Sequence, residues 1–216
     1  MHVRRDSALP GGNGVPAVVR GPRAEPAADA CHLVTATFSG GCFWCLQPPF
    51  DPLPGVMATT VGYTGGRKKH PTHEEVAAGR TGHAAAVQIL YDPGRLSYAQ
   101  LLEVFWHNID PTTPNRQFCA RGAQYRPSIF YHGETQKHVA EASRQTVASW
   151  QRFTGRIATR ITPASEFYSA VPEYQQCYRK HPQCYAHYRY ACGREQHLLV
   201  LWEGTPAICC PVLSSG

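Results

Sequence analysis

One seven-residue stretch, Ser39 to Cys45, constrains the fold of this chain more than any other. It follows a short β-branched run at residues 33–38, which predicts a buried strand. Its glycine pair allows a tight turn, and the six residues that follow contain no breaker and predict the start of a helix. Cys42 is thereby predicted to lie in the first helical turn, where unpaired N–H groups and the helix dipole favour an anion. A thiol in that place should have a lowered pKa and react as a thiolate.

Three interpretations of this stretch compete. Cys42 could be a buried cysteine beside core aromatics, although the strand, turn and helix start argue against that. Cys42 and Cys45 could form a thioredoxin-like Cys-x-x-Cys redox pair. Cys42 could also be a single nucleophile that works with a distant partner.

The composition and charge limit the class of protein that this chain can be. The 216 residues, 43% hydrophobic and 17% charged, predict a soluble globular domain, and no apolar run is long enough to cross a membrane. The charge of +6 is scattered, with one short cluster at residues 67–70, so we expect no nucleic-acid partner. Residues 1–30 predict a disordered leader, 31–203 the folded domain and 204–216 a tail. We expect a monomer.

Nine cysteines are an odd number, which argues against a fully paired secreted scaffold. Redox chemistry in a reducing compartment fits better, so we expect a cytoplasmic protein. A zinc site built from Cys42, Cys45 and two of Cys177, Cys184 and Cys192 is an alternative, but the spacing of the cysteines supports it poorly. We therefore expect no metal and no cofactor.

The remaining pattern interleaves strands with helices and predicts an α/β or α+β sandwich. Predicted strands cover 56–61, 84–91, 124–131 and 157–161, with a turn at 63–66. Predicted helices cover 98–109, capped by Ser97 and Gln100, then 134–153 and 194–202. The segment after residue 163 is rich in tyrosine and is otherwise predicted to be loop-rich.

Five motifs in a fixed order resemble peptide methionine sulfoxide reductase A, over residues 33–203. They are Gly41-Cys42-Phe43-Trp44, Gly62-Tyr63-Thr64-Gly65-Gly66, Thr81-Gly82-His83-Ala84, Asp110-Pro111-Thr112-Thr113 and Gly122-Ala123-Gln124-Tyr125-Arg126. The resemblance implies a ferredoxin-like two-layer α/β sandwich. It also implies reduction of the S epimer of methionine sulfoxide, free or in proteins.

The resemblance further implies a role for particular residues. Cys42 would attack the sulfoxide sulfur and become a sulfenic acid. Phe43 and Trp44 would hold the substrate methyl group, and Tyr125 would face the oxygen. Cys192 would then form a disulfide with Cys42, which thioredoxin would reduce. Cys45 and Cys184 are competing resolving cysteines.

The chain departs from the family pattern at three positions where the family has acidic residues or a tyrosine. Ala85 stands where the family has glutamate, Ala120 replaces an acidic residue, and His73 stands where a tyrosine donates to the oxygen. In one hypothesis His73 replaces the lost donors, and activity falls as pH rises through the histidine pKa. In the other, the chain is a redox sensor or a methionine-sulfoxide-binding protein with little turnover, since losing a positioned acid costs about two to four powers of ten in rate.

Overall fold

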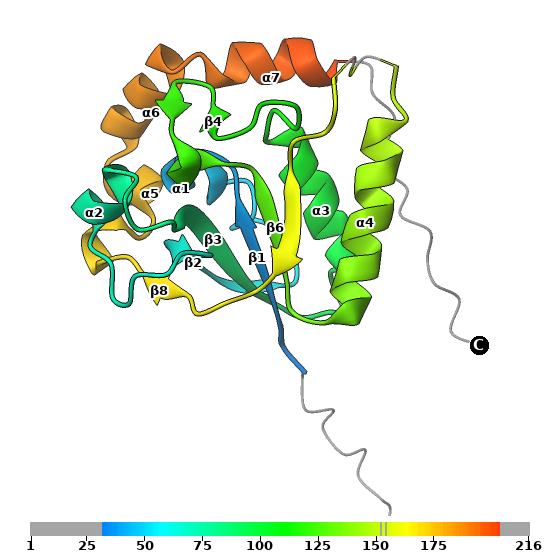
Figure 1. The fold of residues 1–216 in the computed structure, drawn as a ribbon. Helices are drawn as coiled ribbons and strands as arrows, with labels where there is room; N and C mark the ends of the chain where they lie inside the picture. The colour runs from blue at the N-terminus through cyan, green and yellow to red at the C-terminus, as the bar shows by residue number, and fades with distance from the viewer. Residues whose placement is uncertain (1–31, 152, 154, 204–216) are drawn as a thin grey trace, which may run out of the picture. The chain divides into compact units, whose positions relative to one another are not determined.

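The computed structural model describes residues 32–151, 153 and 155–203 (Figure 1). The predicted leader and tail lie outside these residues. A six-stranded sheet forms the centre of the described part, in the order β7-β6-β1-β3-β2-β8, antiparallel except for the parallel pair β6 and β7. Its strands are β1 (Val34–Ser39), β2 (Val56–Thr64), β3 (Ala84–Tyr91), β6 (Ser128–Tyr131), β7 (Arg160–Pro163) and β8 (Tyr168–Ser169). A separate hairpin pairs β4 (Arg116–Gln117) with β5 (Ala120–Arg121).

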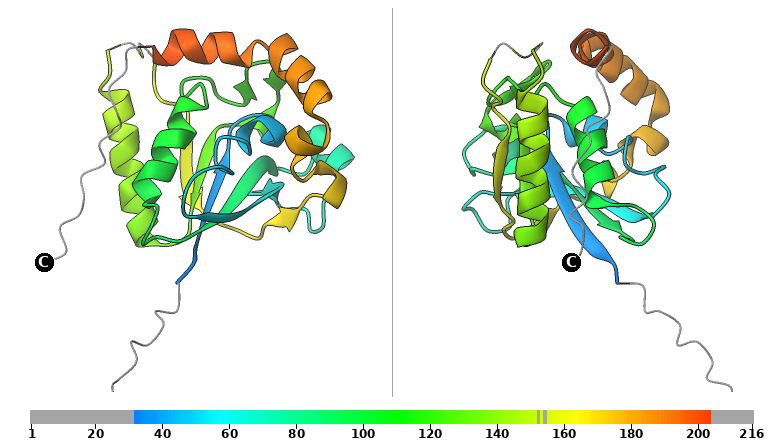
Figure 2. Two further views of the ribbon diagram at one scale, coloured as in Figure 1. Left: turned by 180° about the vertical axis from the view of Figure 1, so that it is seen from behind. Right: turned by 90° about the vertical axis from the view of Figure 1, so that its right-hand side faces the viewer.

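Two helices pack beside the sheet, α3 (Tyr98–His107) and α4 (Glu134–Ala148), and they lie next to each other in Figure 2. The Trp106 indole donates to the Ser143 hydroxyl at 3.0 Å and joins them inside the core. The succession β1, α1 (Phe43–Leu46), β2, β3, α3, β6 follows the β-α-β-β-α-β order of a ferredoxin-like fold. The short α2 (His73–Ala77) is inserted before β3, and the β4–β5 hairpin and a 3₁₀ turn are inserted before β6. The predicted α/β sandwich is confirmed.

Local signals placed several elements correctly. β1 and β3 lie where the β-branched and apolar runs predicted them, and Ser97 and Gln100 form the predicted capping box of α3. The predicted strand at 124–131 is shorter, because residues 123–125 form a 3₁₀ turn, η1 (Ala123–Tyr125), ahead of Pro127. The strand predicted at 157–161 is β7, three residues later, and β2 continues through Thr64 into the predicted turn.

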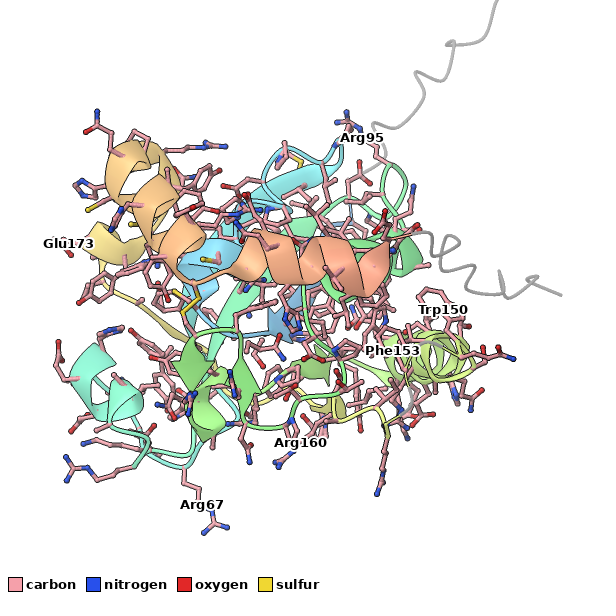
Figure 3. All side chains as sticks on the ribbon, turned by 90° about the horizontal axis from the view of Figure 1, so that it is seen from above. Arg67, Arg95, Trp150, Phe153, Arg160 and Glu173 are labelled. Carbon is pink, nitrogen blue, oxygen red and sulfur yellow. A yellow bond between two sulfur atoms is a disulfide. The ribbon has the colours of Figure 1, made fainter. Side chains whose placement is uncertain are left out.

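The prediction of a loop-rich segment after residue 163 is wrong in its second half. After a 3₁₀ turn, η2 (Pro172–Tyr174), the chain forms α5 (Cys177–Lys180), α6 (Pro182–Ala191) and the predicted α7 (Arg194–Trp202). Pro182 begins α6 and Gly193, in the left-handed conformation, separates it from α7. These helices run along the end of the sheet that carries α1 (Figures 1 and 3).

None of the helices within residues 32–203 that the structure describes has both the length and the apolar character of a membrane span.

Candidate active site

Cys42 lies at the junction between β1 and α1. It is the N-cap residue of α1, with φ −67° and ψ 122°, one position ahead of the predicted first turn. Gly41 makes the turn with φ +87°, and a Cβ there would lie 2.8 Å from the Cβ of Gln117. The glycine is therefore required both by backbone conformation and by space. α1 ends before Pro48 and Pro49, with Gln47 at its C-cap.

The Cys42 thiol is activated by hydrogen bonds. Its pKa is lowered from 9.0 to about 7, first by the thiol of Cys45, and then, against the opposing effect of burial, by the backbone N–H of Trp44 and the hydroxyl of Tyr188. The pKa of Cys45 is raised by its hydrogen bond to Cys42 and by burial. Cys45 therefore keeps its proton at neutral pH, and Cys42 is the member of the pair that ionises, about half of it at pH 7. A four-residue helix adds little dipole, so the thiol partner matters more than the helix start that the sequence suggested.

Access to the two sulfurs differs. Cys42 is partly exposed, whereas Cys45 is only 2% exposed. A substrate can therefore meet the sulfur of Cys42 but not that of Cys45. Of the two cysteines, only Cys42 is therefore placed to react with a molecule from solution.

Rings gather beside Cys42 into an aromatic cluster. Phe43 is buried, and its ring centroid lies about 6 Å from four others, a separation typical of favourable ring pairs. These rings belong to Trp44 (5.9 Å), Tyr63 (5.9 Å), His73 (6.2 Å) and Tyr174 (6.4 Å). The Trp44 indole donates to the backbone carbonyl of Tyr174 at 3.1 Å, which attaches the C-terminal segment to the cluster.

His73 enters the cluster from the first position of α2. A complete capping box of Thr72 and Glu75 fixes this helix start. The His73 ring lies 4.7 Å from the ring of Tyr174, and its Nδ1 is 3.0 Å from the Tyr63 hydroxyl. The structure thus brings His73 beside Phe43, 30 residues away in sequence, and adds Tyr63, a motif residue that the sequence analysis did not assign to the site.

Two further tyrosines lie close to the Cys42 sulfur. Burial raises the pKa of Tyr125, and the charge of Cys42 raises it further. Burial, the charge of Cys42 and a hydrogen bond to it raise the pKa of Tyr188. Both hydroxyls therefore keep their protons at neutral pH and can donate to an oxygen. Tyr188 was not predicted; its only sequence signal was the abundance of tyrosine in the tail.

The two positions that lack the family's acids differ in their surroundings. Ala85 on β3 is 6% exposed, pairs with Tyr63 across the sheet and belongs to the apolar core. Ala120 lies in the β4–β5 hairpin. Glu74 on α2 acts on the pKa of Tyr63, but it is exposed, and hydrogen bonds from its own backbone N–H and the Thr72 hydroxyl lower its pKa. A carboxylate of that kind is ionised at neutral pH and is a weak proton donor.

A buried cation lies beneath the cysteine pair. Arg194, the first residue of α7, is 2% exposed and donates to the backbone carbonyls of Gly40 and Asn108. Its guanidinium lies 4.6 Å from the ring of Phe118. The positive charge lowers the pKa of Cys45, opposing the larger effects that raise it. Arg194 thus anchors α7 to the loop that carries Cys42.

The other cysteines have different surroundings. Cys192, predicted to resolve Cys42, is bonded to Cys119, with the two Cα atoms 5.1 Å apart. Cys184, a competing resolving cysteine, is exposed and lines a cavity of about 420 Å³ with Trp44, Tyr174 and Cys177. Within the described residues, no group of three or more metal-binding side chains is placed to hold an ion, so the geometry gives no support to the zinc alternative.

Comparison with known proteins identifies the family. The sequence model described as peptide methionine sulfoxide reductase matches residues 34–204. The chain belongs to that family. Among named relatives, "Peptide methionine sulfoxide reductase MsrA" of Bacillus subtilis is 47% identical, covering 77% of this chain and 94% of the relative. The protein of the same name from Bacillus licheniformis is 46% identical, covering 77% and 92%.

Solved structures of similar proteins support the same family. The methionine sulfoxide reductase A of Corynebacterium diphtheriae is 31% identical with a TM-score of 0.62, covering 77% of this chain and 81% of that one. Mxr1 from Saccharomyces cerevisiae in reduced form is 28% identical with a TM-score of 0.63, covering 72% and 89%. Membership of the reductase family removes the thioredoxin-like interpretation of Cys42 and Cys45. It gives the chain the fold and chemistry of an oxidoreductase that acts on methionine sulfoxide through thiols.

Proposed function

We propose that this member of the peptide methionine sulfoxide reductase family reduces methionine S-sulfoxide, free or in proteins, with Cys42 as its nucleophile. The observation that carries the proposal is the partly exposed Cys42 sulfur, with a lowered pKa, beside the cluster of Phe43 and Trp44. The thiolate attacks the sulfoxide sulfur. The oxygen, with a proton, passes to Cys42 as a sulfenic acid, and methionine leaves as the thioether. The substrate methyl group packs against the rings of Phe43 and Trp44.

The oxygen needs hydrogen-bond donors as charge builds on it. We propose that His73 and Tyr125 supply them, with Tyr63 holding the His73 ring through the 3.0 Å contact at Nδ1. The nearness of Tyr125 to the Cys42 charge supports this role. Without a buried carboxylate the proton transfer is expected to be slow, so we expect turnover below that of a member with the acid.

The sulfenic acid is resolved by a second thiol. We propose Cys192 for this step, with water as the other product, and a thioredoxin-type dithiol as the reductant that restores the thiols. Cys45 is the alternative, because its sulfur already hydrogen-bonds that of Cys42. We further propose that the protein works as a monomer in the cytoplasm, where such disulfides form transiently during catalysis.

An epimer-resolved assay tests the function. Enzyme, dithiothreitol and a racemic methionine sulfoxide peptide are mixed, and each epimer is followed by chromatography. Selective loss of the S epimer, abolished by Cys42→Ser, is expected. A second candidate function, oxidant sensing through Cys42, is favoured by the alanines at positions 85 and 120. It would give oxidant-driven disulfides without any methionine formed.

A further inference from the structure

A cavity of about 420 Å³ lies between the aromatic cluster and the helices α5 and α6. Two of its lining residues belong to the site already described. They are Trp44, whose ring packs on Phe43, and Tyr188, whose hydroxyl hydrogen-bonds the Cys42 sulfur. The cavity therefore begins at the wall that holds the substrate methyl group. The chemistry of the sulfoxide uses only that wall, so the rest of the space is left for another group.

The surfaces that line this cavity are apolar. The Tyr185 hydroxyl accepts a hydrogen bond from Arg189 at 2.9 Å, and the Tyr188 hydroxyl is engaged by the nucleophile, so the two rings are what the cavity offers to a ligand. Burial raises the pKa of the Cys177 thiol, which therefore stays neutral and behaves as a small apolar group, as a neutral Cys184 thiol does. A lining of rings and thiols favours an apolar ligand.

Hydrogen bonds fix the far wall of the cavity to the helix that follows Cys42. The backbone N–H of Gln176, which precedes α5, donates to the side-chain oxygen of Gln47 at 3.1 Å, and Gln47 is the C-cap of α1. One turn further along, the Tyr178 hydroxyl donates to the buried carboxylate of Asp51. The cavity is therefore preformed, and a ligand that enters it pays little for ordering the protein.

The spacing of the rings matches the reach of a peptide chain. The Trp44 ring lies 5.9 Å from that of Phe43 and 5.6 Å from that of Tyr174, measured between centroids. Consecutive residues of an extended chain advance by about 3.3–3.6 Å, so two residues span about 7 Å. A polypeptide whose methionine sulfoxide lies against Phe43 and Trp44 can therefore place a nearby side chain on the other side of the indole.

We propose that this cavity is a subsite for an apolar side chain, one or two residues from the methionine sulfoxide in a polypeptide substrate. The inference rests on the proposed function and names its substrate class. Glu173 and His181, the polar residues that line the cavity, are both exposed, so they lie at its mouth. The carboxylate of Glu173 disfavours an acidic side chain there. The subsite therefore selects oxidised methionine that has an aromatic or aliphatic neighbour.

A peptide series tests the subsite. Capped pentapeptides hold methionine S-sulfoxide at the centre and glycine elsewhere, and a single phenylalanine is moved through the flanking positions. With dithiothreitol as reductant, phenylalanine at one of these positions should raise kcat/KM about tenfold over the all-glycine peptide, because its ring is buried in the cavity. Glutamate at the same position should give no gain. Equal kcat/KM for glycine and phenylalanine at every position, or an equal gain from glutamate, would overturn the subsite.

Filling the cavity tests whether the preference arises there. Cys184 is exposed and lines the cavity, so Cys184→Trp fills the space without entering the core. The ratio of kcat/KM between the phenylalanine and glycine peptides should fall from about ten to about one. Cys184→Ser keeps the space, and Leu199→Trp adds the same ring at an exposed position of α7 outside the cavity, so both should keep the ratio. A ratio that persists in Cys184→Trp would contradict the assignment to this cavity.

Binding to a protein that lacks the nucleophile separates this inference from the proposed function. Calorimetry with Cys42→Ser should find that the phenylalanine peptide binds about tenfold more tightly than the all-glycine peptide. That preference, without methionine formation by the natural chain, would refute the reductase function and leave a binding site for oxidised peptides. Methionine formation with equal affinities and equal kcat/KM would refute the subsite alone. Neither methionine formation nor a preference would refute both.

Discussion

Replacing Cys45 with alanine should raise the pKa of Cys42 and alter its reactivity in opposite directions at neutral and alkaline pH. The thiol of Cys45 is the largest of the effects that lower the pKa of Cys42 from 9.0 to about 7. Alanine removes that donor and leaves the Trp44 N–H and the Tyr188 hydroxyl in place. Cys45→Ser is the matched control, since serine keeps a donor of similar size.

The size of the effect follows from this shift in the pKa of Cys42. Two pKa units correspond to about 2.7 kcal/mol of preference for the thiolate. If the Cys45 donor supplies half of it, the pKa of Cys42 rises to about 8 in the alanine variant. The thiolate fraction at pH 7 then falls from about one half to about one tenth. A more basic thiolate is a better nucleophile, so alkylation should be about twofold slower at pH 7 and about threefold faster once both proteins are fully ionised.

The measurement is the rate of iodoacetamide alkylation against pH, with Cys42 identified by peptide mass analysis and its ionisation followed by ultraviolet absorbance. The natural chain should gain reactivity as pH rises through about 7 and then level off, because the reactive thiolate is lost only below the pKa. In Cys45→Ala the two rate curves should cross. A midpoint that stays at about 7 in the alanine variant would refute the assignment of Cys45 as the activating donor.

Three other changes test separate parts of the site. Ala85→Glu should raise turnover about tenfold or more, because burial would keep the new carboxyl protonated near neutral pH. Ala85→Gln, which has the same size but no acidic proton, should leave turnover unchanged. His73→Phe keeps the ring packing but removes the partner of the Tyr63 hydroxyl, and kcat/KM should fall about tenfold or more; an unchanged value would exclude His73 from the chemistry. Gly41→Ala should lower the free energy of unfolding by about 1–3 kcal/mol in chemical denaturation, because φ is +87° and the new Cβ meets Gln117; an unchanged midpoint would contradict the geometry.

The elements that the sequence predicted well are those set by neighbours in the chain. The capping box at Ser97, the strand before Gly40 and the helix start after Gly41 each depend on signals within a few residues. The α6 helix gave no such signal, because its tyrosines show no apolar period and none of its residues is fully buried. Contacts with residues distant in sequence hold α6 in place instead, such as the hydrogen bond of Tyr188 to Cys42 and the disulfide of Cys192 with Cys119.

The site likewise contains residues adjacent in sequence, which could be predicted, and contacts between distant residues, which could not. Cys42, Phe43 and Trp44 are adjacent in sequence, and the roles proposed for them come from one motif. The pairing of Cys119 with Cys192, 73 residues apart, could not be deduced, since sequence alone does not give disulfide connectivity. Nor could the partnership of Tyr63 with His73, which depends on how α2 packs against the end of β2.

The pH profile of the first turnover can distinguish the two kinds of oxygen donor in the site. Burial is the first cause that raises the pKa of Tyr63, Tyr125 and Tyr188 alike, so these hydroxyls stay protonated well above neutral pH. If they alone stabilise the sulfoxide oxygen, the rate should rise as Cys42 ionises and then stay level. If His73 supplies the proton as well, its loss should lower the rate once Cys42 is ionised, and the profile should still level off. Single-turnover rates of the natural chain and of His73→Phe separate these cases: a lower plateau in the variant would assign the proton to His73, and equal plateaus would assign the oxygen to the tyrosines.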